Sequence, residues 1–167
     1  MNTHHHAHKE STRKPNGAGR QKATTSKPSP SRSRTTEAHA DEVGPLMDRF
    51  GQALTAGDGA AIARMWDVPA LMISDGGTQA VTSAKELEKI FSGAKDQYHA
   101  RGIEEAVAEV QSVDWLTDRV ALARVRWPYI DKAGREIGEE SSTYTLRQSD
   151  DGALKIQAVV MHGAKTA

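Results

Sequence analysis

The chain has 167 residues and a formal net charge of zero, with 22 basic and 22 acidic side chains. It contains no cysteine, which excludes disulfides and thiol chemistry, and with no signal-like apolar segment this favours a cytoplasmic protein. No stretch approaches the roughly 20 apolar residues that span a bilayer, so we expect no membrane partner.

The composition divides the chain near residue 40. Residues 1–40 carry eight Lys or Arg against two Glu, whereas residues 41–167 carry fourteen against twenty. The first segment has almost no large apolar side chains, so it cannot offset the entropy cost of ordering. We therefore predict a disordered basic tail over residues 1–40 and one folded domain over residues 41–167.

Two features of the tail have both a functional and a simpler interpretation. Four histidines in a short run have ring nitrogens that bind divalent metals: His4, His5, His6 and His8. Nothing fixes their geometry, and such a run is typical of a purification tag, so no metal site is expected. The basic residues of segment 26–34 would contact nucleic acid phosphates or an acidic partner. A solubilising leader, or a tail that folds back on the acidic domain, explains them as well.

The first predicted elements are two helices separated by a sharp joint. A helix from about Asp41 has one apolar stripe, formed by Leu46, Phe50, Ala53 and Leu54. Gly57 can adopt the left-handed conformation that ends a helix, and Asp58 can accept hydrogen bonds from the first amides of the next one. Pro69 keeps this second helix short.

The rest of the chain predicts a strand, a third helix and then a run of strands. Residues 70–74 form the first strand, followed by a turn at residues 75–77. Residues 82–98 predict a helix with Ser83 as its N-cap and Glu86 three residues later. Four strand-like runs joined by turn residues then predict an antiparallel meander: 103–116, 119–130, 139–148 and 153–163. Such an order indicates an α+β domain with helices covering one face of the sheet.

Alternation predicts the two faces of each strand. In the run 119–130, the inner face consists of Ala121, Ala123, Val125 and Trp127. The opposite face mixes apolar and charged residues, as in a partly covered dimer interface. In the next strand, Ser142 and Tyr144 share a face with Leu146. The last strand leaves two alternatives open: either Ile156, Ala158 and Val160 point inward with His162, or Val159 and Met161 do.

The order of these segments resembles the nuclear-transport-factor-2-like (NTF2-like) superfamily, which includes SnoaL-like polyketide cyclases and ketosteroid isomerases. The segments that carry the resemblance are "ALTAGD", "MW", "DWLTDRVALARVRW", "SSTYTLR" and "DGALKI". The resemblance covers residues 41–167. It implies a cystatin-like cone, in which three N-terminal helices pack on a curved antiparallel sheet around a pocket, and a homodimer.

The isomerase branch of this superfamily implies particular site residues. It uses a carboxylate base, a tyrosine and a protonated acid. Transferred by position, the tyrosine falls on Phe50, which cannot donate a hydrogen bond. The base falls on Ser74, with Asp75 beside it, and the acid falls near Tyr144. Steroid isomerisation is therefore not favoured.

Our leading hypothesis is a SnoaL-like domain that binds a small, partly apolar ligand without a cofactor or metal. The residues expected to line its pocket are Phe50, Trp66, Ser74, Val125, Trp127, Ser142 and Tyr144. One alternative is a cyclase, isomerase or dehydratase that uses Asp67 or Asp75 as the base and Tyr144 as the donor. Another is a non-catalytic dimeric interaction module whose basic tail binds nucleic acid or an acidic partner.

Overall fold

The computed structural model describes the backbone of residues 31–166 and the side chains of residues 42–165. The predictions for residues 1–30, including the histidine run, lie outside these residues. The elements in chain order are α1 (Ser31–Ala56), α2 (Gly59–Met65), β1 (Trp66–Ser74), β2 (Gly77–Val81), α3 (Ala84–Phe91), α4 (Ala94–Ala100), β3 (Glu105–Ala106), β4 (Glu109–Trp115), β5 (Val120–Ile130), β6 (Glu136–Gln148) and β7 (Leu154–Thr166). In the described part of the chain, no helix has the length and apolarity needed to cross a membrane.

Helix α1 begins earlier than the sequence predicts. It starts at Ser31, so residues 31–40, which we assigned to a disordered tail, are helical in the structure. This segment contains neither Gly nor Pro and directly follows Pro30, so nothing in its backbone chemistry stops the helix. The apolar stripe that marked the predicted start therefore lies within the helix and does not mark its first residue.

The predicted joint between the first two helices is confirmed. Gly57 has a φ of +66° directly after α1, in the left-handed region that favours glycine. The Asp58 side chain caps α2 by accepting a hydrogen bond of 2.9 Å from the amide of Ala61. The chain therefore changes direction within two residues.

The predicted third helix is divided into two. Ser83 is its N-cap as predicted, since Ser83 Oγ accepts a 3.2 Å hydrogen bond from the amide of Glu86. However, α3 ends at Phe91 and α4 begins at Ala94, because Ser92 and Gly93 interrupt the helix with a turn. Gly59 of α2 lets α3 come close, because a Cβ there would lie 2.6 Å from the carbonyl oxygen of Glu88.

The sheet contains seven strands in the order β2-β1-β7-β6-β5-β3, and β4 also pairs with β5. The meander from β4 to β7 is antiparallel as predicted, but β1 and β7 are parallel, so the sheet is mixed. Strand β2 was not predicted, because only Val81 of its five residues is buried and its sequence is mostly polar. The predicted run 103–116 is also interrupted, as β3 and β4 are separate strands.

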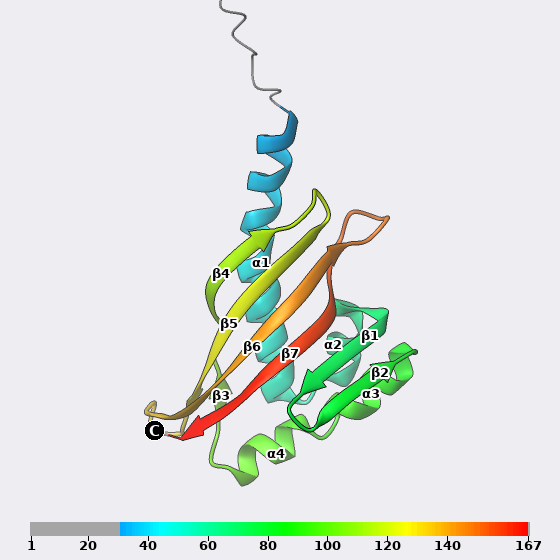
Figure 1. Ribbon diagram of the computed structural model, residues 1–167. Helices are drawn as coiled ribbons and strands as arrows, with labels where there is room; N and C mark the ends of the chain where they lie inside the picture. The colour runs from blue at the N-terminus through cyan, green and yellow to red at the C-terminus, as the bar shows by residue number, and fades with distance from the viewer. Residues whose placement is uncertain (1–30, 167) are drawn as a thin grey trace, which may run out of the picture.

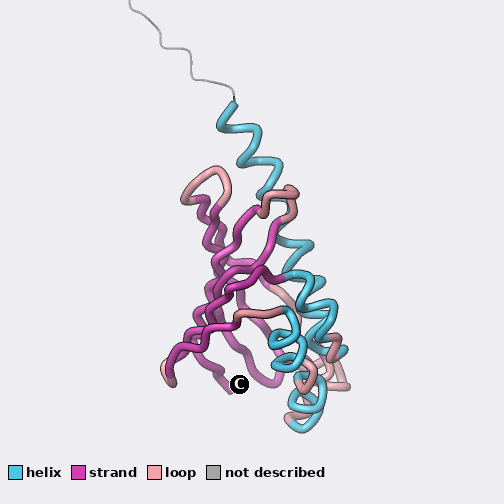
Figure 2. Tube along the Cα trace, turned by 90° about the vertical axis from the view of Figure 1, so that its right-hand side faces the viewer, coloured by secondary structure: helices cyan, strands magenta, loops and turns pink. Residues whose placement is uncertain are grey.

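The helices pack on the concave face of the curved sheet, as Figures 1 and 2 show. The architecture is therefore the predicted α+β class, with one more helix than expected. The predicted inner face of β5 is confirmed, since Ala121, Ala123, Val125 and Trp127 are all buried.

An irregularity in β7 answers the question that alternation left open. Leu146 pairs with Ile156, whereas Thr145 pairs with Ala158, so Gln157 is an extra residue in β7. Ile156 and Val159 are consequently both buried on the inner face. His162 lies on the outer face, with its Nε2 2.8 Å from Thr143 Oγ1.

Candidate functional site

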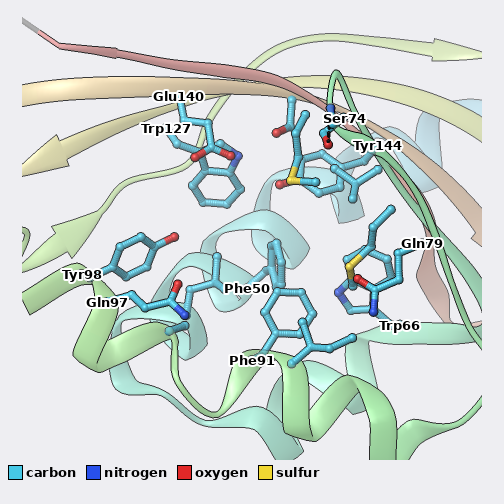
Figure 3. A pocket seen from close by; sticks show the side chains of 18 of the residues that line it. Phe50, Trp66, Ser74, Gln79, Phe91, Gln97, Tyr98, Trp127, Glu140 and Tyr144 are labelled. Atoms are coloured by element: carbon cyan, nitrogen blue, oxygen red, sulfur yellow. Dashed lines mark hydrogen bonds between the residues drawn. The ribbon is translucent and has the colours of Figure 1, made fainter. Parts of the chain in front are cut away.

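A cavity of about 650 Å³ lies between the helices and the concave face of the sheet. Its wall is built by α1, α3 and α4 on one side and by β1, β2, β5, β6 and β7 on the other. Figure 3 shows the side chains that line it. The helices and the sheet both contribute, so the cavity depends on the whole fold.

Phe50 of α1 is at the centre of an aromatic cluster at this wall. Its ring makes edge-on contacts with four other rings, at centroid distances of 6.2 Å to Trp66, 5.9 Å to Phe91, 5.9 Å to Trp127 and 6.0 Å to Tyr144. Such edge-to-face pairs are favourable beyond the area they bury. The cluster gives the cavity a rigid and largely apolar surface.

Buried polar atoms interrupt this apolar surface on β1, β5 and β6. Ser142 is 1% exposed, and its Oγ has no hydrogen-bond partner among the described residues; the same is true of Nε1 of Trp66 and of Trp127. Burial raises the pKa of Tyr144, and the nearby side chains of Trp127 and Ser142 act to lower it. Neither of these two side chains forms a hydrogen bond of normal geometry with the Tyr144 hydroxyl. These donors and acceptors are therefore available at the cavity wall.

Glu140 of β6 adds a carboxylate to the cavity wall. Tyr129 donates a hydrogen bond of 2.5 Å from its hydroxyl to Glu140 Oε2. Burial raises the pKa of Tyr98 to about 12, and the negative charge of Glu140 adds to the rise. Burial also raises the pKa of Tyr129 and of Tyr144, and Glu140 contributes in both cases. All three phenols are therefore neutral donors at physiological pH.

Six of the seven residues predicted to line the pocket are at the cavity wall in the structure: Phe50, Trp66, Ser74, Trp127, Ser142 and Tyr144. Val125 is not, because it is completely buried in the core. Neither aspartate proposed as a base lines the cavity either. Asp67 follows the inward-facing Trp66 on β1 and accepts a hydrogen bond from the amide of Val68. Asp75 is exposed in the turn between β1 and β2.

Several lining residues were missed in the sequence, and Glu140 is the most informative of them. It lies two residues before Ser142, so the alternation that places Ser142 and Tyr144 on the inner face of β6 also places Glu140 there. Gln79, Gln97 and Tyr98 were missed because β2 was not recognised and the third helix was treated as one. Among the described residues, no group of three or more His, Asp or Glu is arranged to hold a metal ion.

Residues 41–164 match the family model described as NTF2-like protein (DUF6841). The chain belongs to this family. The match confirms the resemblance that the sequence motifs indicated and covers most of the chain. A comparison of this NTF2-like protein with curated proteins found no match.

Several solved structures have the same fold as this chain. A domain of unknown function with a cystatin-like fold from Nostoc punctiforme PCC 73102 is 20% identical, with a TM-score of 0.61 over 75% of this chain and 76% of that chain. An NTF2-like protein with a cystatin-like fold from Novosphingobium aromaticivorans is 16% identical, with a TM-score of 0.59 over 78% and 84%. An NTF2-like superfamily protein from Salmonella enterica serovar Typhimurium LT2 is 12% identical, with a TM-score of 0.56 over 77% and 92%. At these identities the similarity establishes the cystatin-like fold alone.

Proposed function

We propose that this NTF2-like protein binds a small, partly apolar molecule in the cavity between its helices and its sheet. The volume of about 650 Å³ falls within the range of small-molecule sites, which are mostly apolar with a few polar groups. The observation that carries the proposal is the pair of unpartnered polar atoms, Ser142 Oγ and Trp127 Nε1, on the buried aromatic wall. Leaving such an atom without a partner costs about 1–3 kcal/mol, which a ligand that bonds to it would offset.

The test is thermal unfolding of the full chain in the presence of steroids, polyketide intermediates and aromatic acids. A compound at 100 times its dissociation constant adds about 2.7 kcal/mol to the free energy of unfolding, a shift of several degrees. Ala94 of α4 lines the cavity, so Ala94→Phe fills it and should abolish the shift. Ala100→Phe, on the exposed end of the same helix, is the matched control. A shift that persists in Ala94→Phe would locate binding elsewhere.

A second candidate function is proton transfer, favoured by the presence of Glu140 beside neutral tyrosine hydroxyls. A carboxylate within an aromatic wall, with Tyr144 and Tyr98 as donors, has the groups that acid–base chemistry on a bound ligand requires. Glu140 replaces Asp67 and Asp75 as the candidate base, because neither aspartate lines the cavity. Turnover of the compounds that raise the melting temperature should be lost in Glu140→Gln, and unchanged turnover would exclude this role.

We also propose that two copies of the chain pair through the outer face of the sheet. Leu71 and Val160 are 42% and 41% exposed there, and Val160 pairs with Ile73 on the neighbouring strand. Neighbouring apolar side chains of this kind are typical of an interaction surface. Light scattering of the full chain should give the mass of a dimer, and Val160→Lys should reduce it to that of a monomer. A monomeric wild-type chain would contradict the proposal.

A further inference from the structure

The charged groups at the cavity wall are unbalanced. Among the described residues that line the cavity, Glu140 is the one carboxylate, and there is no Lys, Arg or His. The three tyrosines around it are neutral, because burial raises their pKa values, that of Tyr98 to about 12, so they supply hydrogen-bond donors but no positive charge. A ligand that enters the cavity therefore meets a carboxylate without a matching cation on the wall.

The arginines near Glu140 form no ion pair with it. No basic side chain of residues 42–165 lies within ion-pair distance of it. Arg126 lies on the outer face, where it forms ion pairs with Glu109, Glu136 and Glu139. Arg101 stacks over the ring of Tyr129, with its guanidinium carbon 4.9 Å from the ring centroid, and acts to lower the pKa values of Tyr98 and Tyr129. It does not line the cavity and forms no ion pair with Glu140. A carboxylate at a cavity wall that has no cation as its partner favours an occupant that brings a positive charge.

The surroundings of Glu140 also suit a cation. Trp127 pairs with Glu140 across β5 and β6, and Tyr129 donates its hydroxyl to one carboxylate oxygen. Figure 3 shows Glu140 beside Trp127, with Tyr98 projecting from the opposite wall. Aromatic faces attract ammonium groups by cation–π interaction, and a carboxylate binds them by charge-assisted hydrogen bonds. A carboxylate and aromatic rings therefore occur together where Glu140, Trp127 and Tyr98 line the cavity.

We infer that the ligand of this cavity carries a positively charged amine on an apolar or aromatic body, and that Glu140 selects this charge. The apolar body packs on the ring cluster around Phe50, and the ammonium group binds at Glu140 beside Trp127 and Tyr98. This inference deepens the proposed binding function and rests on it. It concerns which molecules bind, and is independent of whether the protein catalyses a reaction on them.

The test compares three probes of one shape and different charge, titrated into the full chain at pH 7 by calorimetry. These are 2-naphthylmethylamine, 2-naphthylmethanol and 2-naphthoate. We expect the amine to bind about tenfold or more tightly than the neutral alcohol, because a charge-assisted hydrogen bond is about twice as strong as a neutral one, and the carboxylate to bind most weakly. Equal binding of amine and alcohol would overturn the inference while leaving the proposed binding function intact. If none of the three binds, the inference fails, and the Ala94→Phe experiment decides the proposed function separately.

Two variants locate the selectivity at Glu140. Glu140→Gln keeps an oxygen that accepts the Tyr129 hydrogen bond but removes the charge, so the affinity for the amine should fall to that for the alcohol. Glu139→Gln is the matched control, because it removes the same charge one residue away, on the outer face where Glu139 pairs with Arg126. A preference for the amine that persists in Glu140→Gln, or that is lost equally in Glu139→Gln, would overturn the assignment to Glu140. Thermal unfolding of both variants verifies that they are folded.

Discussion

Gly51 of α1 sets how closely the helix approaches the sheet, and Gly51→Ala tests that contact. A Cβ at this position would lie 2.8 Å from the carbonyl oxygen of Ala106 and 2.9 Å from Cζ3 of Trp127. One neighbour is strand backbone and the other is a buried indole, so neither can move without a cost. Overpacking of this kind costs about 1–3 kcal/mol. Alanine is better than glycine inside a helix by about 1 kcal/mol, so the expected net loss is up to about 2 kcal/mol.

This loss should lower the melting temperature of the full chain by up to about 8 °C, measured by circular dichroism. Gly44→Ala is the control, because it lies in the same helix and nothing is within 4 Å of its Cβ position. The proline that follows Gly44 reduces the gain in helix propensity, so we expect no change or a small increase in stability. A Gly51→Ala chain that is more stable than the wild type by the roughly 1 kcal/mol that alanine gains inside a helix would refute the argument that α1 and the sheet are in close contact at Gly51.

Three further predictions concern the cap of α2, the tyrosines and the turn after β1. Asp58→Ala removes the hydrogen bond to the amide of Ala61 and should cost about 1 kcal/mol in chemical denaturation, whereas Asp58→Asn should retain most of the stability. All three tyrosines of the chain have raised pKa values, so absorbance at 295 nm should show none of them ionising near pH 10 while the chain is folded. The folded chain then binds more protons than the unfolded chain above pH 10, so its stability should be complete below about pH 10 and fall as the pH rises toward 12; a third of the absorbance change with a midpoint near pH 10 would contradict this. Asp75→Asn should leave ligand affinity unchanged, because Asp75 lies outside the cavity wall, and a loss of more than a few-fold would show that the turn contacts the ligand.

Local chemistry was the most reliable guide to this fold. Gly57, Asp58 and Ser83 act within a few residues of themselves, so their roles as helix ends and caps could be predicted and are confirmed. The inner faces of β5 and β6 followed from strict alternation. Features that depend on distant partners could not be predicted in this way. The parallel pairing of β1 with β7 and the extra residue at Gln157 depend on where strands far apart in the sequence meet.

The candidate site shows the same division. Trp66, Trp127, Ser142 and Tyr144 could be placed on the cavity wall because each lies on a strand with a clear inner face. Asp75 was considered as a base because it adjoins Ser74. It lies in an exposed turn, however, where strand alternation does not determine the direction of a side chain. Glu140 was within reach of the alternation argument, yet an acidic residue at a strand end is ordinarily assigned to solvent. Its inward position became evident only with Tyr129 and Tyr98 around it.

The most direct test of ligand binding in the cavity is a crystal structure of the full chain with the compound that raises its melting temperature most. The account predicts one molecule between the helices and the concave face of the sheet, with its apolar part against Phe50 and Trp127 and a polar group toward Ser142 or Glu140. A compound bound on the outer face of the sheet, with the cavity empty or closed, would contradict it.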